Sequence, residues 1–270
     1  MIDLHTHILW GIDDGSKSVD MSSVMLDIAE ENGTKVIFAT PHVIEFINKP
    51  KWELIVEKSK QMQQIANNKN LNIEILPGAE IQMNWDLLPE IGVQGSYCLN
   101  GSRYALIELP VLEIPEYADE FFYELLLKGI VPIIAHPERN QVIMNNLTKL
   151  LEWMRNGVLL QCNSGSVTGA FGNKVRENVE ILLKNRLITF IGSDAHRDKR
   201  RDTNLIGAKK IMMDLVGKDY CEEIFYRNPS YILKNELVEV NVPDKILSMN
   251  KNSNIWNKLM SFISSTRRSI

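Results

Sequence analysis

Short apolar runs alternate with longer stretches of helical periodicity along most of this 270-residue chain. The short runs are rich in aliphatic and β-branched residues and end at glycine, proline or polar residues, which is typical of buried strands. Seven strands are predicted in this way, over residues 2–7, 35–40, 72–77, 104–109, 131–136, 158–163 and 187–192. Their nearly continuous apolar character predicts a sheet that is covered on both faces.

Helices are predicted between these strands, and a glycine follows several of them. Residues 20–32, 116–128 and 147–156 have helical periodicity, and each range is followed by a glycine, where a left-handed helix cap is common. Repeated alternation of strand and helix predicts a parallel sheet and an α/β fold. Closure into a TIM-like barrel is the preferred prediction, and an open doubly wound sheet is the alternative.

The strand–helix pattern ends near Leu237, which divides the prediction into a barrel domain, residues 1–237, and a C-terminal tail, residues 238–270. No acidic residue follows Asp244, and the tail has one apolar stripe at helical spacing on a basic background. The stripe consists of Ile255, Trp256, Leu259, Met260 and Ile263. We predict a helical tail that either makes peripheral contact with an anionic membrane surface or packs against the barrel or a second subunit.

Composition and charge narrow the class of protein. Hydrophobic residues make up 44% of the chain and charged residues 24%, as in ordinary soluble domains. The net charge of −4 gives no general attraction to nucleic acid, and neither an export signal nor a membrane-spanning run is recognisable. The cysteines are three in number and widely spaced, which argues against a disulfide framework. We therefore predict a cytoplasmic protein without a nucleic-acid partner.

Polar residues gather where the predicted strands end, and in a parallel barrel this edge carries the catalytic groups. All five histidines of the chain lie at such ends, together with four carboxylates. The set comprises His5, His7, Asp14, His42, Glu80, Glu108, His136, Asp194 and His196. Nine ligands are too many for one tetrahedral zinc ion and suit a cluster of two or three divalent ions. Mixed imidazole and carboxylate ligands favour manganese, iron or zinc over magnesium.

Charge at this edge predicts a phosphate substrate. Three divalent ions with four carboxylates leave a net charge of about +2, which attracts a phosphate dianion. Arg139 follows His136 closely, and Arg201 lies in the loop after Asp194; a guanidinium group matches phosphate oxygens in geometry. Arg197 and Arg200 share that second loop, so the choice of Arg201 among them is left open.

These residues stand in motifs that resemble a known family. The motifs are His5-Thr-His7, Asp13-Asp-Gly15, Thr40-Pro-His42, Gly78-Ala-Glu80, Ser102-Arg-Tyr-Ala-Leu-Ile-Glu108, Ala135-His-Pro-Glu-Arg139 and Gly192-Ser-Asp-Ala-His196. They resemble the polymerase and histidinol phosphatase (PHP) superfamily and, within it, the bacterial metal-dependent protein tyrosine phosphatases of the CpsB/YwqE type. The resemblance covers roughly residues 1–237 and implies a distorted seven-stranded barrel.

The resemblance also implies a distribution of ligands among three divalent ions, most readily manganese. In that distribution Glu80 bridges two of the ions. The first ion is held by His5, His7, Glu80 and Asp194, the second by Glu80, Glu108 and His136, and the third by Asp14, His42 and His196. The implied substrate is a phosphotyrosine-bearing protein, a membrane-anchored bacterial tyrosine kinase that controls capsule or exopolysaccharide synthesis.

The predicted chemistry is hydrolysis of phosphotyrosine by a metal-bridging hydroxide, with Arg139 and Arg201 gripping the phosphoryl oxygens. Phenolate, with a pKa near ~10, leaves without strong help from a general acid. Two alternatives stay open: a small-molecule phosphatase such as histidinol phosphatase, and a non-catalytic regulatory metal protein. A cysteine phosphatase is disfavoured, because the segment from Cys221 to Arg227 has no glycine and reads as a helix. A polymerase-associated nuclease is weaker still, since no basic stripe surrounds the strand ends.

Overall fold

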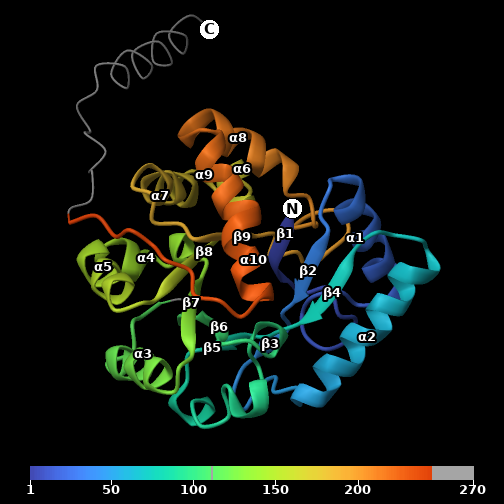
Figure 1. Cartoon of the computed structure of the whole chain (residues 1–270), viewed down its shortest axis with the longest axis horizontal. Coiled ribbons are helices and arrows are strands. Elements are labelled where there is room, and N and C mark those ends of the chain that lie inside the picture. The colour runs from blue at the N-terminus through green and yellow to red at the C-terminus, as the bar shows by residue number, and fades with distance from the viewer. Residues whose placement is uncertain (111, 245–270) are drawn as a thin grey trace, which may run out of the picture.

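The computed structural model describes residues 1–110 and 112–244, in which a curled parallel sheet is surrounded by helices (Figure 1). The strands are β1 Ile2–Thr6, β2 Val36–Ala39, β3 His42–Val43, β4 Glu74–Pro77, β5 Glu80–Gln82, β6 Tyr104–Glu108, β7 Val131–Ala135, β8 Leu159–Asn163 and β9 Phe190–Gly192. The α-helices are α1 Val19–Glu31, α2 Trp52–Asn68, α3 Ala118–Leu127, α4 Gln141–Met144, α5 Leu147–Arg155, α6 Ser164–Thr168, α7 Asn173–Lys184, α8 Ile206–Val216, α9 Lys218–Glu222 and α10 Asn228–Leu233. A π-helical turn, Glu223–Arg227, joins the last two helices.

All paired strands are parallel, in the orders β1-β2-β4 and β3-β5-β6-β7-β8-β9. Backbone hydrogen bonds connect the two sets where β1 meets the end of β9: the Asp194 N–H donates to the His5 carbonyl (2.7 Å), and the His7 N–H donates to the Ala195 carbonyl (2.9 Å). The sheet therefore curls round so that its first and last strands meet at their C-terminal ends.

Each of the seven predicted strand ranges contains a strand, which confirms the α/β prediction. The structure adds two short strands, β3 and β5, which follow β2 and β4 after only two residues. Gly78 makes the second of these turns possible, because a Cβ atom there would lie 2.8 Å from the Leu99 side chain and 3.1 Å from that of Thr40. The three helix ranges predicted from sequence correspond to α1, α3 and α5, with ends that differ by at most two residues.

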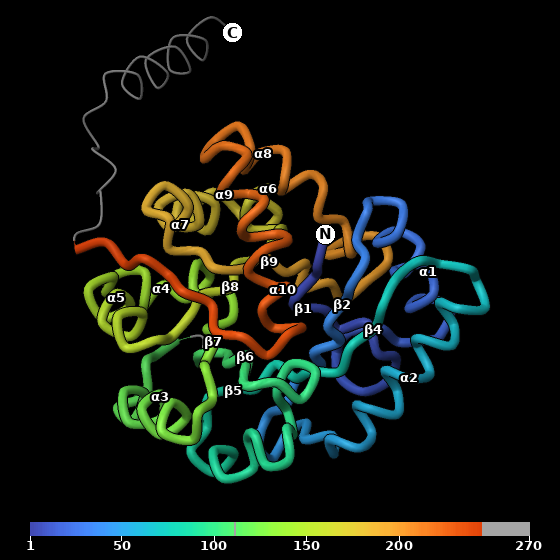
Figure 2. The backbone as a smooth tube through the Cα atoms, viewed as in Figure 1, coloured from blue at the N-terminus to red at the C-terminus, as the bar shows by residue number. Residues whose placement is uncertain are grey.

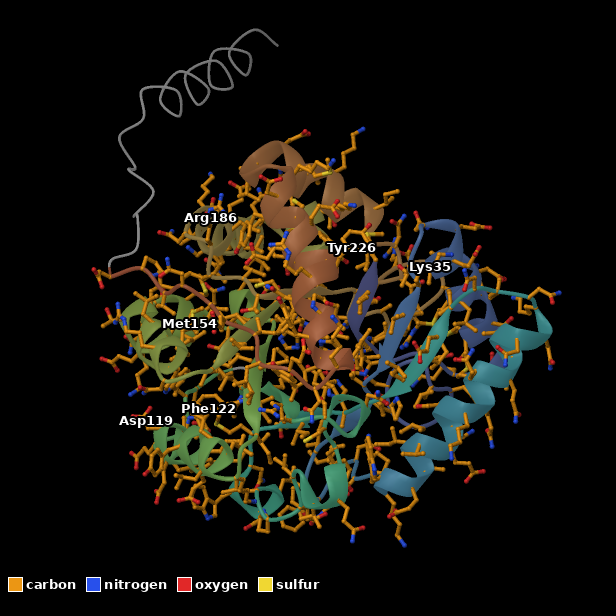
Figure 3. The ribbon with its side chains drawn as sticks, viewed as in Figure 1. Lys35, Asp119, Phe122, Met154, Arg186 and Tyr226 are labelled. Carbon is orange, nitrogen blue, oxygen red and sulfur yellow. The ribbon has the colours of Figure 1, made fainter. Side chains whose placement is uncertain are left out.

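Apolar side chains fill both faces of the sheet. Leu4, Phe38, Leu106 and Phe190 belong to a cluster of buried residues contributed mainly by the strands. On the other face, Phe122 of α3 is almost completely buried and points inward, whereas the nearby Asp119 lies at the surface (Figure 3). Polar atoms can reach solvent chiefly at the strand ends, so the fold leaves the C-terminal edge for chemistry.

The chain after α10 passes the N-terminal end of β6, where Tyr104 lies, and reaches α5 (Figure 2). The Tyr104 hydroxyl donates to the Glu236 carbonyl (2.6 Å), and Arg155 Nη2 donates to the carbonyls of Pro243 (3.0 Å) and Asp244 (3.1 Å). The apolar stripe of the predicted tail lies outside the described residues, so its helix and its contacts stay predictions. In the part of the chain that is described, no helix combines the length and apolar character needed to cross a membrane.

Candidate metal and phosphate site

The C-terminal edge of the sheet brings together all nine predicted ligands. Eight of them lie in three overlapping groups, within each of which one ligand atom per residue can be chosen so that all lie within 4.8 Å of one another; the ninth, His136, lies beside Glu80. The groups are His5, His7, Glu80 and Asp194; His42, Glu80 and Glu108; and His7, Asp14, His42 and His196. Residues as far apart in sequence as His7 and His196, whose ring centres lie 4.0 Å apart, therefore meet because their strands end at one edge.

The first group is completely enclosed. Glu80 Oε2 lies 3.1 Å from the Nε2 atoms of both His5 and His7. Asp194 Oδ1 lies 3.7 Å from His5 Nε2 and 3.4 Å from His7 Nε2. All four side chains are buried, and buried charges persist only when they are paired or bound to metal.

The other two groups share His42. Its Nδ1 atom lies 3.1 Å from Glu80 and 3.9 Å from Glu108, while its Nε2 atom lies 3.7 Å from Asp14. His136 also approaches the two glutamates, with Nε2 at 2.7 Å from Glu80 Oε1 and 3.7 Å from Glu108 Oε1. The resemblance assigned His136 to Glu80 and Glu108, and the structure places His42 within reach of the same pair.

Two observations show that these residues fit metal ions. His5 Nε2 and His7 Nε2 face each other at 3.0 Å, although a ring nitrogen that is free to ligate has no proton to share with another. Among the described residues, Glu80 Oε2 and His42 Nδ1 are buried and have no hydrogen-bond partner. Lone pairs that converge without protons between them suit a cation, and the mixture of imidazole and carboxylate suits a transition metal.

Burial also shifts the pKa values of two candidate ligands, Glu108 and His196. Burial raises the pKa of Glu108 to about 7, and the neighbouring charge of Glu80 adds to the effect. Burial lowers the pKa of His196 to about 3, with a further contribution from His7. A divalent cation supplies the charge that favours ionised carboxylates and unprotonated histidines here.

Asp194 links the ligands to the two predicted phosphate-binding arginines. Its Oδ1 atom faces the histidines, and its Oδ2 atom accepts hydrogen bonds from Arg139 Nη1 (2.9 Å) and Asn163 Nδ2 (2.7 Å). Arg201 Nη2 lies 2.8 Å from the same Oδ2. Within the described structure Arg201 Nε has no acceptor, so this guanidinium keeps a donor for another oxygen.

The loop after β9 separates the arginines that sequence left open. Arg197 Nη1 donates to the carbonyls of Asp14 (2.6 Å), Gly15 (2.7 Å) and His196 (2.7 Å), so its donors tie the loops together. Arg200 is exposed, whereas Arg201 turns toward Asp194. The structure therefore favours Arg201 over Arg197 as the second candidate, beside Arg139, for binding phosphate.

Asp13, which the prediction passed over in favour of Asp14, contacts two of the candidate ligands. Its Oδ2 atom lies 2.7 Å from His7 Nδ1 and accepts from the His42 N–H (2.9 Å), and its Oδ1 atom accepts from the Gly15 N–H (2.9 Å). Burial alone would raise its pKa, but the adjacent His7 ring and the hydrogen bonds outweigh burial and lower the pKa to about 2. Asp13 thus fixes the ring of one ligand and the backbone of another. The adjacent acidic pair was the only sequence signal for it.

Gln161 and Asn163 of β8 were also missed as supports. Gln161 Oε1 lies 3.0 Å from His5 Nδ1, and Gln161 Nε2 donates to Asn163 Oδ1 (3.0 Å). Asn163 in turn donates to Asp194, so an amide chain connects two ligands. Alternate positions in a strand share a face, which was the available signal.

Backbone strain accompanies the site. His136 (φ 33°) and Asp194 (φ 51°) are both in the left-handed region, which non-glycine residues rarely occupy. Gly15 permits the loop after β1 to fold back, because a Cβ atom there would lie 2.3 Å from the His7 carbonyl oxygen. The geometry of the ligands is therefore held by the fold.

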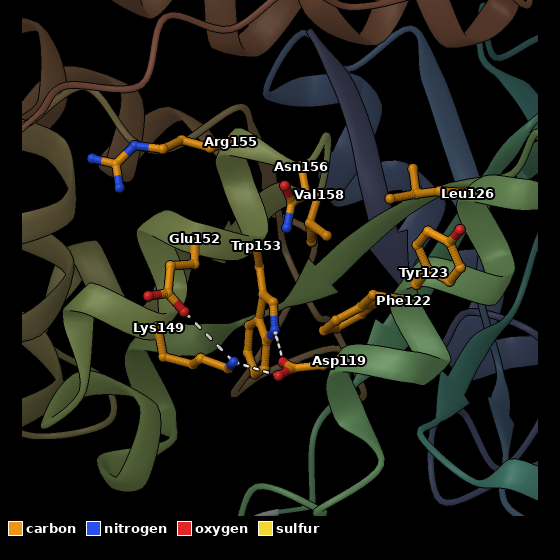
Figure 4. Close-up of a pocket in the computed structure, with 10 residues that line it drawn as sticks. All are labelled: Asp119, Phe122, Tyr123, Leu126, Lys149, Glu152, Trp153, Arg155, Asn156 and Val158. Atoms are coloured by element: carbon orange, nitrogen blue, oxygen red, sulfur yellow. Dashed lines mark hydrogen bonds and ion pairs between the residues drawn. The ribbon is translucent and has the colours of Figure 1, made fainter.

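Cavity size does not locate this site. A groove of about 710 Å³ lies between α3 and α5, with Phe122 and Trp153 in its wall and Asp119 paired to Lys149 at 2.5 Å (Figure 4). No candidate metal ligand lines it. A cavity of only about 90 Å³ lies at the site, where the candidate ligands Glu108 and His136 line it together with Arg139.

The cysteines are poorly suited to nucleophilic catalysis. All three are buried, and burial raises the pKa of Cys98 to about 12 and that of Cys221 to about 11. The segment from Cys221 to Arg227 is helical, as predicted, through α9 and the π-helical turn. A thiolate cradled by a phosphate-binding loop is therefore incompatible with this structure.

Comparison with known proteins identifies a family and relatives that the chain resembles over most of its length. The sequence profile of the family described as "Capsular polysaccharide synthesis, CpsB/CapC" matches residues 1–234. A putative tyrosine-protein phosphatase CapC from Staphylococcus aureus is 36% identical over 90% of this chain and 95% of its own. The tyrosine-protein phosphatase YwqE from Bacillus subtilis is 33% identical over 88% of this chain and 93% of its own.

A solved structure agrees with these relatives. A chain from the crystal structures of YwqE from Bacillus subtilis and CpsB from Streptococcus pneumoniae, described as unique metal-dependent tyrosine phosphatases, superposes with a TM-score of 0.85. It is 32% identical and covers 90% of this chain and 98% of its own. A histidinol phosphate phosphatase from Lactococcus lactis, 16% identical with a TM-score of 0.52, shares the fold. The resemblance expected from sequence is confirmed, and the chain belongs to the CpsB/CapC family of capsular polysaccharide synthesis proteins.

Proposed function

We propose that this protein is a metal-dependent protein-tyrosine phosphatase. The observation that carries the proposal is the pair of faces on Asp194: Oδ1 belongs to an enclosed ligand group, and Oδ2 orients two guanidinium groups beside it. A phosphoryl group has to meet metal ions and cationic donors at once, and this carboxylate holds both in register. The relatives named as tyrosine-protein phosphatases support the choice of substrate.

The ligand sets proposed are those implied by the family; Glu80 and His42 each belong to two of the ligand groups and would each be able to serve either of two neighbouring ions. These residues would hold three divalent ions, manganese in preference to iron, zinc or magnesium, which would supply positive charge for the phosphoryl oxygens and lower the pKa of water. For the fold we propose a seven-stranded barrel, in which β2 with β3, and β4 with β5, each count as one strand.

The chain's own residues perform the rest of the mechanism. Arg139 and Arg201 each use one N–H group on Asp194 and direct others toward the oxygens of the phosphoryl group. Asp13 holds His7 in the tautomer that leaves its Nε2 lone pair free. The tyrosine leaves as a phenolate with a pKa near ~10, so the site requires little proton donation to the leaving group.

The proposed substrate is a phosphotyrosine-bearing protein, a membrane-anchored tyrosine kinase in capsule or exopolysaccharide synthesis, met in the cytoplasm. The capsular polysaccharide name of the family and the phosphatase names of the relatives support this role. Peripheral contact of the tail with the membrane is kept as one of its two predicted uses.

The experiment compares phosphate release from a phosphotyrosine peptide and from histidinol phosphate, with manganese and with chelator. We expect manganese-dependent turnover of the peptide, and its loss in His136→Ala and Glu108→Gln. Glu113→Gln is the matched control, because Glu113 is exposed and lies outside the ligand groups. Preference for histidinol phosphate would replace the proposal by the small-molecule alternative, and metal binding without turnover would leave a regulatory metal protein.

A further inference from the structure

Phe171 lies against both arginines of the site. It comes from the loop after α6, whereas Arg139 follows β7 and Arg201 follows β9. The guanidinium carbon of Arg139 lies 4.6 Å from the centre of the Phe171 ring, and that of Arg201 lies 5.6 Å from it. One aromatic side chain therefore contacts both cationic groups, which belong to separate loops.

The loop that presents Phe171 is built for this position. Gly165 stands under the ring, where a Cβ atom would come within 2.8 Å of Phe171 Cε2. Gly169 (φ 84°) and Gly172 (φ 90°) flank the residue in the left-handed region, which lets the chain turn out and back. The Ala170 N–H donates to the Gly165 carbonyl (2.8 Å), which closes the turn.

The same loop is anchored to the neighbour of Arg139. Glu138 is completely buried, and its Oε1 atom accepts from the Asn163 N–H (2.9 Å) and from Ser166 Oγ (2.6 Å). Ser166 lies in α6, directly before the turn that carries Phe171. The ring and the Arg139 backbone are therefore parts of one hydrogen-bonded unit.

The two arginines need such a partner because they are alike in charge and share one acceptor. Arg139 and Arg201 both donate to Asp194 Oδ2, at 2.9 Å and 2.8 Å. Each arginine side chain is about one-third exposed, and Asp194 fixes only one of the terminal nitrogens of each guanidinium group. The face of an aromatic ring attracts a guanidinium and limits its rotation. A ring in contact with both guanidinium groups restricts them before phosphate binds, so that less conformational entropy is lost on binding.

We infer that Phe171 is a positioning residue for the phosphate-binding arginines, holding both guanidinium groups in the orientation that receives a phosphoryl group. The inference rests on the proposed function. Phe171 itself carries no polar group and acts through Arg139 and Arg201. Its removal should weaken phosphate binding and raise KM, with kcat changed less.

The test measures binding of inorganic phosphate to the manganese-loaded full chain by calorimetry, beside steady-state kinetics with a phosphotyrosine peptide. We expect Phe171→Leu to weaken phosphate roughly 5- to 30-fold, from the loss of two cation–π contacts. Phe171→Tyr, which keeps the ring, should recover most of the affinity. Manganese content and the melting temperature should match the unaltered protein. If Phe171→Leu melts early, Phe171→Met gives the same comparison with a longer and more adaptable side chain.

A double-mutant cycle shows whether the effect passes through the arginines. In an Arg139→Gln, Arg201→Gln background, Phe171→Leu should change phosphate affinity less than 2-fold (~0.4 kcal/mol). The matched control is Tyr226→Leu. It removes a ring whose centre lies 4.6 Å from Lys209 Nζ, at a position outside the site, and it should leave phosphate affinity unchanged.

The outcomes separate the inference from the proposed function. Equal losses from Phe171→Leu with and without the arginines, or no loss in either, would overturn the positioning role even if the peptide is hydrolysed. Phosphate binding that depends on Phe171 in a protein that does not hydrolyse phosphotyrosine would support the positioning role and reject the proposed substrate.

Discussion

Replacement of Asp13 by asparagine tests how the first loop builds the metal site. All three groups that face the Asp13 carboxylate are N–H donors: the His7 ring, the His42 backbone and the Gly15 backbone. An amide in its place has to turn its own NH2 toward one of them. Asp13→Asn should therefore preserve volume and lose at least one of these contacts, with His7 free to rotate or change tautomer.

The pKa of Asp13 gives the magnitude. Its fall from 3.8 to about 2 corresponds to about 2 kcal/mol of preference for the charged carboxylate, at about 1.36 kcal/mol per pKa unit. This is an upper bound for the effect on metal binding, because His7 is neutral when it ligates and the attraction is then weaker. We expect metal affinity to fall roughly 10- to 30-fold, in line with other supports of ligating histidines.

The assay is competition for manganese against a chromophoric chelator, with melting temperature recorded on the same samples. Asp20→Asn is the control, since Asp20 is exposed in the first turn of α1. Manganese affinity of Asp13→Asn within about 2-fold of the unaltered protein would refute the role of Asp13 as the support of His7.

Three further changes test the fold around the site. Burial raises the pKa of Asp3 to about 6, so the folded state loses up to about 3 kcal/mol of stability as pH rises from about 4 to about 7; urea unfolding of Asp3→Asn should lack this loss, and parallel pH profiles would contradict it. Gly15→Ala should cost ~1–3 kcal/mol and weaken manganese binding, because the new methyl group meets the His7 carbonyl; unchanged denaturant midpoints would disprove the close approach. Tyr104→Phe should lower the free energy of unfolding by ~1–3 kcal/mol without affecting manganese affinity, since it frees the Glu236 carbonyl far from the ligands; differential calorimetry with metal titration checks both expectations.

The order of strands and helices follows from local sequence, because alternation and length of apolar runs are local properties. The runs around Leu106 and Ile133 are strands in the structure, and the glycine-terminated helices are α1, α3 and α5. The positions of the histidines at strand ends could be predicted as well, because the ends of the apolar runs are also visible in the local sequence. A parallel α/β sheet then requires that these ends share an edge.

The short strands β3 and β5 were not predicted. Each follows another strand after two residues, and nothing in the local pattern distinguishes a second pairing from a loop. What separates Glu80 from the preceding strand is the close packing of Gly78 against Leu99 and Thr40, which is a contact between segments distant in sequence. Such contacts have no local signature.

The sequence by itself determined which residue types were available for chemistry: five histidines, the acidic residues beside them and the arginines that follow. Only the tertiary structure decided which atoms each of these side chains contacts. It turned Arg197 to backbone carbonyls and Arg201 to Asp194, and it made Asp13 a support for His7. Neighbours in sequence take different roles because a side chain's role depends on the atoms it meets, and these atoms come from strands whose separation along the chain is far greater than their separation in space.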